Sequence, residues 1–405
     1  MLGGEEDVIM QKEIILLLRH ASFMSLLIVS ICVLRAASPT WAGSLEELKQ
    51  ALRSNDIEVA WSALRDIPQE LPPQQKEETV KVLTKALRKE WARCGGDIRQ
   101  SIADQLVALD AKDAIADLLK LISENKNIEH ECAECGCCFL SSSVSDTFIE
   151  LEPDLFCENS VLRALYSLST FSYAKEISEL VESTPRYRPQ MLVILGKIGH
   201  SRYAHFIAKF ADREPLAVAQ ALGAIKQSSG IPVLGRLLED SNEFVRWAAS
   251  RSLTLIGGER VVDTVKLRLH HPKEDISALA ARTLGVLGVD DGLPVLRNLS
   301  QNAETPLTRS MAVAYLGQLK DLESRATFVA GLQDKSLLVR TYSIYALGYV
   351  GEASDIPKIE ACLFEVKTID PRNAADEEGL RLIDETAREA LEQIRTRSGK
   401  KAVSP

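Results

Sequence analysis

This chain of 405 residues has few aromatic residues and no excess of positive charge. Aromatics make up 5% of the chain, and its net charge is −9. Because binding to nucleic acid requires a basic excess or a basic stripe, we expect no nucleic-acid partner. The hydrophobic fraction of 46% consists mostly of Leu, Ala, Val and Ile, which is typical of packed helices.

Motifs of common catalytic chemistry are also missing. The sequence contains no Gly-rich phosphate loop, no G-x-S-x-G turn and no H-E-x-x-H pair. His200 and His205 stand alone and are predicted as surface residues, whereas His270-His271, next to Pro272, is predicted to cap a turn. These absences favour a protein that is not an enzyme and holds no cofactor.

The uncharged run Phe23–Leu34 has 12 residues, whereas a helix that crosses a bilayer needs about 20. Arg19 and His20 precede the run and small residues follow it, a pattern typical of a secretory signal peptide. We therefore predict a signal peptide at residues 1–42, an initiator at Met10 or Met24, and export to the bacterial periplasm or cell envelope. A buried amphipathic first helix is the alternative.

One motif recurs through the second half of the chain. Its anchor leucines lie 31, 31, 32 and 31 residues apart, at Leu222, Leu253, Leu284, Leu316 and Leu347. Small or β-branched residues lie four positions before them, at Val218, Ala249, Ala280, Ala312 and Ser343. Such a period is typical of stacked helical hairpins. We predict an all-α fold, an α-solenoid wound as a right-handed superhelix.

Each unit is predicted to contain two helices. The Gly that follows most anchors, such as Gly317, is expected to weaken the last turn of the first helix. The second helix opens with Pro in its first turn, at Pro232, Pro294 and Pro357, where Pro costs no hydrogen bond. In one unit the second helix is predicted to bury Val265, Leu267 and Leu269.

Fainter copies of the anchor extend the array in both directions, at Leu64, Leu106, Leu165, Leu195 and Leu391. The breaks between them define the predicted segments: degenerate repeats at 43–128, a cysteine-rich loop at 129–159, repeats at 160–363, an acidic loop at 364–380, a capping helix at 381–398 and a tail at 399–405. Asp376, Glu377 and Glu378 lie in the acidic loop and could attract a basic partner or a divalent cation.

Two stretches, 237–246 and 332–340, both read L-x-D-x-x-x-x-V-R. They resemble the HEAT-like repeat of the phycobilisome-lyase type. The resemblance implies that Asp240, Arg246, Asp334 and Arg340 tie adjacent units together as a structural ladder. It also raises bilin lyase-like chaperone activity as an alternative function, against which the export signal argues.

Five of the eight cysteines lie close together, at Cys132, Cys135, Cys137, Cys138 and Cys157. In an exported protein these five and Cys94 are predicted to form disulfides. The sequence does not determine which cysteines pair with one another. Zinc or an iron–sulfur cluster is the alternative for the five, and thiol redox chemistry is a third. Cys362 is predicted as a buried free thiol.

Taken together, these patterns favour a scaffold that holds another protein on the concave face of the solenoid, as a monomer or a small oligomer. Lys266 and Arg297 lie 31 residues apart and are predicted to stack in adjacent units, where they could line a groove for an acidic partner. A metal-binding or thiol-redox protein that works through the loop from Cys132 to Cys157 is the main alternative.

Overall fold

The computed structural model describes residues 45–124 except 55, 88 and 90–95, then residues 160–367 and 374–403. The predicted signal peptide, Cys94 and the cysteine-rich loop lie outside these ranges. The described residues fold as α-helices and short 3-10 helices, without a strand among them. None of their helices combines the length and the apolar character that crossing a membrane requires.

The described residues form two compact units, divided after Ile225. The helices of the N-terminal unit are α2 (Leu45–Arg53), α3 (Ile57–Arg65), α4 (Pro73–Leu87), α5 (Gly96–Ala108), α6 (Ile115–Ser123), α7 (Ser160–Leu168), α8 (Ala174–Ser183), α9 (Arg188–Ile198), α10 (Arg202–Ala208) and α11 (Pro215–Ile225). Within this unit α5, α7, α9 and α11 pack in succession, and α6 packs on α8.

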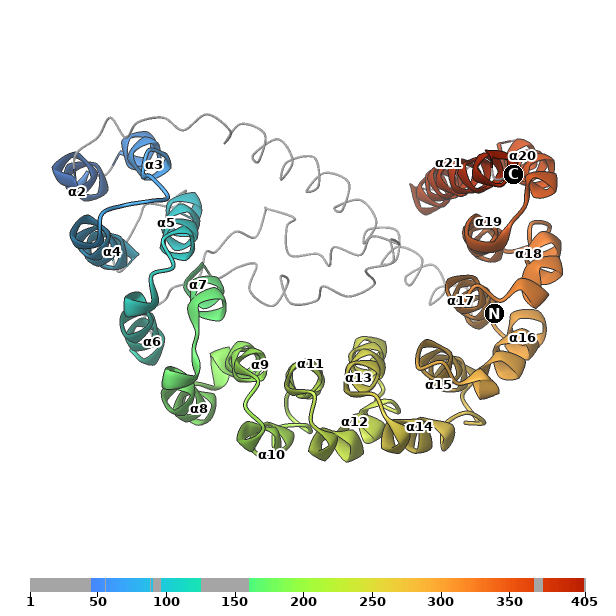
Figure 1. Ribbon diagram of the computed structural model, residues 1–405, viewed down its shortest axis with the longest axis horizontal. Coiled ribbons are helices and arrows are strands. Elements are labelled where there is room, and N and C mark those ends of the chain that lie inside the picture. Colours follow the sequence, from blue (N-terminus) through green and yellow to red (C-terminus); the bar gives the residue numbers. More distant parts are fainter. Residues whose placement is uncertain are drawn as a thin grey trace. The chain divides into compact units, whose positions relative to one another are not determined.

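The helices of the C-terminal unit are α12 (Ile231–Leu237), α13 (Glu243–Ile256), α14 (Glu259–Lys266), α15 (Glu274–Val286), α16 (Leu293–Asn302), α17 (Pro306–Gln318), α18 (Arg325–Gly331), α19 (Leu337–Val350), α20 (Ile356–Val366) and α21 (Ala374–Val403). Figure 1 shows two rows in this unit. We call α13, α15, α17 and α19 the inner row, and α12, α14, α16, α18 and α20 the outer row. The 3-10 helices η6 (Asp290–Gly292), η7 (Leu322–Ser324) and η8 (Ala353–Asp355) lead into α16, α18 and α20.

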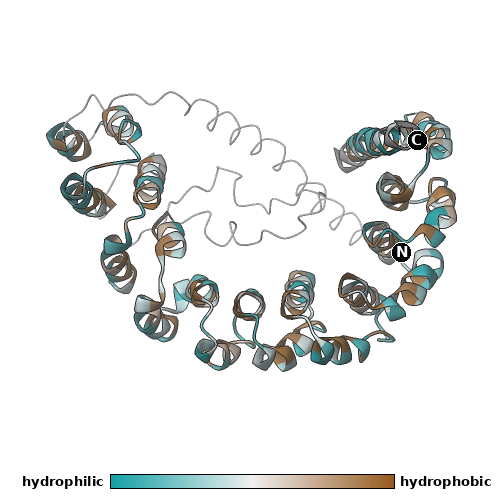
Figure 2. Cartoon of the chain, in the orientation of Figure 1, coloured by the Kyte–Doolittle hydropathy of each residue, from teal (hydrophilic) through white to brown (hydrophobic). Residues whose placement is uncertain are grey.

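The repeat period has a direct structural cause. All five anchor leucines are buried, as are the small residues four positions before them. The fainter anchors Leu64, Leu106, Leu165, Leu195 and Leu391 are also buried. Hydrophobic and hydrophilic residues alternate around the helices (Figure 2), as expected where one face of each helix packs on its neighbours. The prediction of an all-α solenoid is confirmed.

Helix starts follow the residues that the sequence places there. Pro232, Pro294 and Pro357 occupy the first turns of α12, α16 and α20, as predicted. Asn242 accepts a hydrogen bond from the backbone N–H of Phe244 and caps α13. The Thr305 hydroxyl does the same for Thr308 in α17.

Gly317 lies in the last turn of α17, where it was predicted, and it also faces the next inner helix. A Cβ atom at Gly317 would lie 2.7 Å from the Cα of Ala346, on the next inner helix. A Cβ atom at Gly285 would meet the end of the Leu319 side chain, and one at Gly348 would meet the Gln393 side chain and lie 3.3 Å from the Cα of Ala390. These glycines therefore allow adjacent helices to approach closely.

Two predictions are wrong in detail. Leu267 is 81% exposed, because it lies two residues from the buried Val265 and Leu269 and therefore on the opposite face of the helical turn. The predicted acidic loop at 364–380 overlaps the end of α20, and α21 begins at Ala374 instead of residue 381 and continues to Val403. The acidic residues 376–378 therefore lie near the start of α21 and not in a loop.

Candidate binding face of the C-terminal repeats

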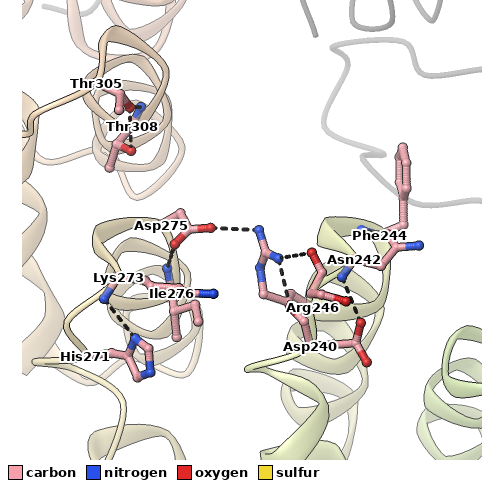
Figure 3. Close-up of polar contacts among 11 residues, drawn as sticks. Asp240, Asn242, Phe244, Arg246, His271, Lys273, Asp275, Ile276, Thr305 and Thr308 are labelled. Atoms are coloured by element: carbon pink, nitrogen blue, oxygen red, sulfur yellow. Dashed lines mark hydrogen bonds and ion pairs between the residues drawn. The ribbon is translucent and has the colours of Figure 1, made fainter. Parts of the chain in front are cut away.

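The polar residues of the L-x-D-x-x-x-x-V-R motif organise the turn between α12 and α13 (Figure 3). The Asp240 carboxylate accepts the backbone N–H of Asn242 at 2.8 Å. The Arg246 guanidinium donates to the carbonyl oxygens of Asp240 and Ser241, and to the carboxylate of Asp275 at 2.7 Å. Arg246 thus connects its own turn to the next unit, whereas Asp240 holds the turn.

The second copy of the motif repeats this division of roles. Asp334 accepts the backbone N–H of Ser336, and Arg340 donates to the Asp334 carbonyl. The Asp334 carboxylate lies 3.8 Å from Arg309 of the preceding unit, and Arg340 lies 3.7 Å from Glu365. Arg246, Arg309 and Arg340 all lie seven residues before an anchor leucine.

The unit that contains α15 replaces both motif residues. His271 occupies the position of Asp240, and its Nδ1 accepts the backbone N–H of Lys273 at 3.0 Å, so its predicted role as a turn cap is confirmed. Ser277 occupies the position of Arg246, and its hydroxyl donates to the Leu269 carbonyl. At this repeat position, seven residues before the anchor, the unit of α15 has no arginine that reaches the next unit.

Lys266 and Arg297, the predicted groove residues, lie on the outer row and are paired within the stack. The Lys266 ammonium is 2.7 Å from the carboxylate of Asp291, in the 3-10 turn of the next unit. Arg297 contacts Asp321 and Glu323 of the following 3-10 turn. Arg325 repeats the arrangement with Asp355 at 2.7 Å. These cations connect successive outer helices and are not free to receive an acidic partner.

Burial shapes the ionisation of two of these acidic residues. Desolvation raises the pKa of Asp355, but hydrogen bonds from Arg325, the backbone of Glu352 and Lys358 outweigh it, so its pKa lies below the ordinary value. The same balance, with Arg297 and Ser324 as donors, lowers the pKa of Asp321. Both side chains therefore remain charged in mildly acidic solution.

The inner row carries an arginine in a different setting. The Arg282 guanidinium, on α15, lies over the rings of Trp247 on α13 and Tyr315 on α17, at 5.3 and 5.4 Å from their centroids. Its Nε donates to Gln318 at 3.4 Å. Within the described parts of the chain Arg282 has no carboxylate partner, and desolvation lowers its pKa.

A polar and aromatic network continues from this arginine along the inner row. Gln318 donates to the Tyr345 hydroxyl at 3.3 Å, and that hydroxyl is 3.0 Å from the hydroxyl of Tyr349. Burial raises the pKa values of Tyr315 and Tyr342, the latter to about 12. Both phenols therefore remain protonated at neutral pH.

Residues two positions before and two positions after the anchors, except the buried Ala314, make up one partly exposed band of the inner row. We call this band the inner strip; it comprises Arg251, Leu255, Arg282, Val286, Gln318, Tyr345 and Tyr349. Leu255 and Val286, on adjacent helices, are 43% and 51% exposed. The Arg251 side chain, one helix before Arg282, likewise forms no ion pair within the described residues. The strip therefore presents apolar side chains next to arginines that lack a counterion.

Sequence reasoning missed the inner strip because it compared anchors and not the positions beside them. Trp247, Arg282 and Tyr315 are distant in sequence and lie on three different helices. Their offsets from the anchors, six, two and one residues before, would have placed them side by side. The offset of each residue from its anchor is the signal that could have revealed the cluster.

The cysteine predictions fall mostly on residues outside the described ranges. Cys94, Cys132, Cys135, Cys137, Cys138 and Cys157 all lie there. Cys362 is a buried free thiol, as predicted, and its sulfur contacts the Leu332 carbonyl at 3.2 Å. Burial raises the pKa of this thiol, which disfavours the reactive thiolate.

The repeats match a known family. The family model of HEAT repeats matches residues 208–285, 265–348 and 293–378. Deoxyhypusine hydroxylase of Danio rerio is 27% identical over 44% of this chain and 70% of its own length.

Solved structures that match this chain include an engineered protein, with 18% identity, a TM-score of 0.31 and coverage of 86% of this chain and 98% of that chain. Another is the complex of CpcE and CpcF of phycocyanin lyase from Nostoc sp., with 15% identity, a TM-score of 0.30 and coverage of 79% and 98%. Residues 208–378 are therefore HEAT repeats, and the described part of the chain folds as an all-α solenoid.

Proposed function

We propose that this protein is a non-enzymatic scaffold that holds another protein against the inner row of its C-terminal unit. The observation that carries the proposal is the contrast between the two rows. On the outer row, Lys266, Arg297 and Arg325 are paired with carboxylates of the next unit. On the inner strip, Arg251 and Arg282 have no such partner in the part of the chain that the structure describes.

Exposed apolar side chains support the same face. Leu255 and Val286 lie on neighbouring inner helices, with aromatic residues and Arg282 beside them. Aromatic and arginine side chains are enriched among the residues that dominate binding energy at protein interfaces. Covering apolar surface contributes about 25 cal/mol per Å², so a partner that covers the strip gains from contacts that water does not provide.

Capture of partners from the native host tests this proposal. Leu255→Glu and Val286→Glu place a charge on the inner strip, and we expect each to abolish capture of proteins that the wild-type chain retains. Leu267→Glu is the matched control, because Leu267 is exposed but follows an outer helix. Equal capture by all three variants would exclude the inner row as the binding face.

Export is part of the proposal and rests on the run Phe23–Leu34 with its flanking residues. An exported scaffold would meet its partner in the periplasm or cell envelope. Amino-terminal sequencing of the protein purified from its host tests this point. Cleavage near Ala42 supports export, and an intact amino terminus in the cytosolic fraction contradicts it.

The cysteine-rich loop supports a second candidate, a metal-binding or thiol-redox protein. Its basis is the close spacing of Cys132, Cys135, Cys137 and Cys138. Metal analysis after purification without chelators, together with thiol alkylation with and without reductant, separates the possibilities. Stoichiometric zinc or iron favours the metal site, whereas thiols that react only after reduction favour disulfides.

Enzymatic candidates come from relatives. The zebrafish relative is named for the hydroxylation of deoxyhypusine, and incubation with a deoxyhypusine-containing protein, followed by a search for a mass gain of one oxygen atom, tests that activity here. For the bilin lyase-like alternative, visible absorbance of an acceptor protein after incubation with bilin is the corresponding measurement.

A further inference from the structure

We infer that the inner strip binds an extended acidic peptide segment that also carries apolar side chains, with one carboxylate placed on Arg282. This inference rests on the proposed function, because it names the chemistry of the partner that the inner row would hold. Its starting point is a cation, Arg282, held between two aromatic rings and left without a carboxylate by the described part of the chain.

Desolvation is the first reason to expect a carboxylate. Burial disfavours the charged form of Arg282, as its lowered pKa shows. A charge that has lost part of its hydration without gaining a counterion is costly. A ligand carboxylate supplies the missing counterion and accepts paired N–H bonds from the planar guanidinium. On the outer row Arg297 already has this paired arrangement with Asp321, and Arg325 donates one N–H bond to Asp355.

Preorganisation is the second reason. Trp247 and Tyr315 flank Arg282, and Gln318 holds its Nε, so the guanidinium plane is fixed before a ligand arrives. Less side-chain entropy is then lost on binding. The Tyr315 hydroxyl is buried and has no hydrogen-bond partner among the described residues, which leaves a further polar group at the same cluster.

Spacing along the strip indicates an extended peptide. Packed helices lie ~8–10 Å apart, and an extended chain advances ~3.3 Å per residue. Ligand side chains about three residues apart therefore reach successive inner helices. A carboxylate on Arg282 and another on Arg251 would leave apolar side chains between them to cover Leu255 and Val286, which are exposed on the same two helices.

The same features disfavour a nucleic acid. Binding to a phosphate backbone depends on many cations, each replacing counterions. The inner strip offers only Arg251 and Arg282, with apolar residues beside each, and the net charge of the chain is −9. An acidic protein segment satisfies both the charge and the apolar surface of the strip.

The test uses the full chain and a fluorescein-labelled synthetic peptide in which glutamates lie three residues apart, each followed by leucine, with glycine and serine in the remaining positions. Fluorescence anisotropy gives its Kd. We expect binding that weakens with salt, and roughly tenfold or greater weakening for Arg282→Gln. Arg251→Gln should weaken binding less. Arg260→Gln is the matched control, because Arg260 is an exposed arginine of the outer helix α14 without a side-chain partner among the described residues, and it should bind like the wild type.

Two comparisons do not depend on the stability of a variant. A peptide with glutamine in place of glutamate should bind the wild-type chain at least tenfold more weakly, and a single-stranded RNA of similar length should not compete. Equal binding of both peptides, competition by the RNA, or an unchanged Kd in folded Arg282→Gln would overturn the inference. If Leu255→Glu abolishes capture of the native partner while Arg282→Gln leaves it intact, the proposed scaffold function stands and the acidic-peptide inference fails.

Discussion

Single residues decide how each helix of the array ends. Gly257 and Gly288 have positive φ angles after inner helices, and Lys320 adopts φ 56° at the matching position after α17. A side chain in this left-handed region costs about 1 kcal/mol. At position 320 the array therefore has a lysine where the backbone conformation favours glycine.

Lys320→Gly should raise the free energy of unfolding by about 1 kcal/mol, because glycine removes the steric cost of the left-handed conformation. Urea denaturation measures the change. Gly288→Ala is the converse control: a Cβ there has nothing within 4 Å, so its expected loss of similar size is conformational only. A destabilising Lys320→Gly would show that the lysine side chain contributes more than its backbone costs.

The ionised Asp355 carboxylate should make stability depend on acid. Its pKa is lowered in the folded chain, so its contribution is complete above the unfolded value of about 3.9 and is lost as pH falls through the folded value. We expect the urea concentration at the unfolding midpoint to decrease once the pH is below about 4. At neutral pH, Asp355→Asn should lower the free energy of unfolding by roughly 2 kcal/mol. Asp291→Asn, at a half-exposed pair, should change the midpoint little. An equal effect of the two variants contradicts the role of burial.

At the scale of the helices, close approach governs the inner row. Gly317→Ala should destabilise the chain by about 1–3 kcal/mol, because the added methyl group meets the backbone of Ala346 on α19. Gly379→Ala in α21 is the control, since nothing lies within 4 Å of its Cβ and alanine favours a helix by about 0.5–1 kcal/mol. Thermal unfolding of both variants checks the opposite signs, and a neutral Gly317→Ala would mean that the helices can move apart freely.

The helices could be predicted from the sequence, but most contacts between them could not. The buried anchors and the proline starts follow from a period and from local rules, so the helices were predictable. The pairing of Arg297 was not, because Asp321 reaches it only once the next 3-10 turn is in place. Leu267 was assigned to the core from its apolar side chain alone, although residues two apart on a helix lie on opposite faces. The Arg282 cluster depends on packing among three helices, which no single motif encodes.

In the C-terminal unit as a whole, each repeat is stabilised by packing on its neighbours. We therefore expect unfolding to begin at an end of the unit, where a repeat has only one neighbour. Ile394 in α21 is fully buried, and α21 packs on α19. Ile394→Ala should cost about 2–4 kcal/mol, and hydrogen exchange should quicken in α19–α21 while α12–α15 keep their protection. Uniform loss of protection across the unit would instead show that it unfolds as a single cooperative block.

Ser277 removes one charged link on the inner side of the unit that contains α15, where Arg282 with Gln318 and the Glu274 carboxylate with the Glu304 backbone still join it to the next unit. Arg246 and Arg309 each extend toward a carboxylate of the following unit, but Ser277 turns back to the Leu269 carbonyl. On the outer row the same junction is held by Arg297 and Asp321. Tension along the C-terminal unit would therefore separate α15 and α17 at the inner row first, while the pair of Arg297 and Asp321 keeps the outer row together. Arg282 and Tyr315 stand on either side of that opening, so stretching the unit would loosen its grip on whatever the arginine holds.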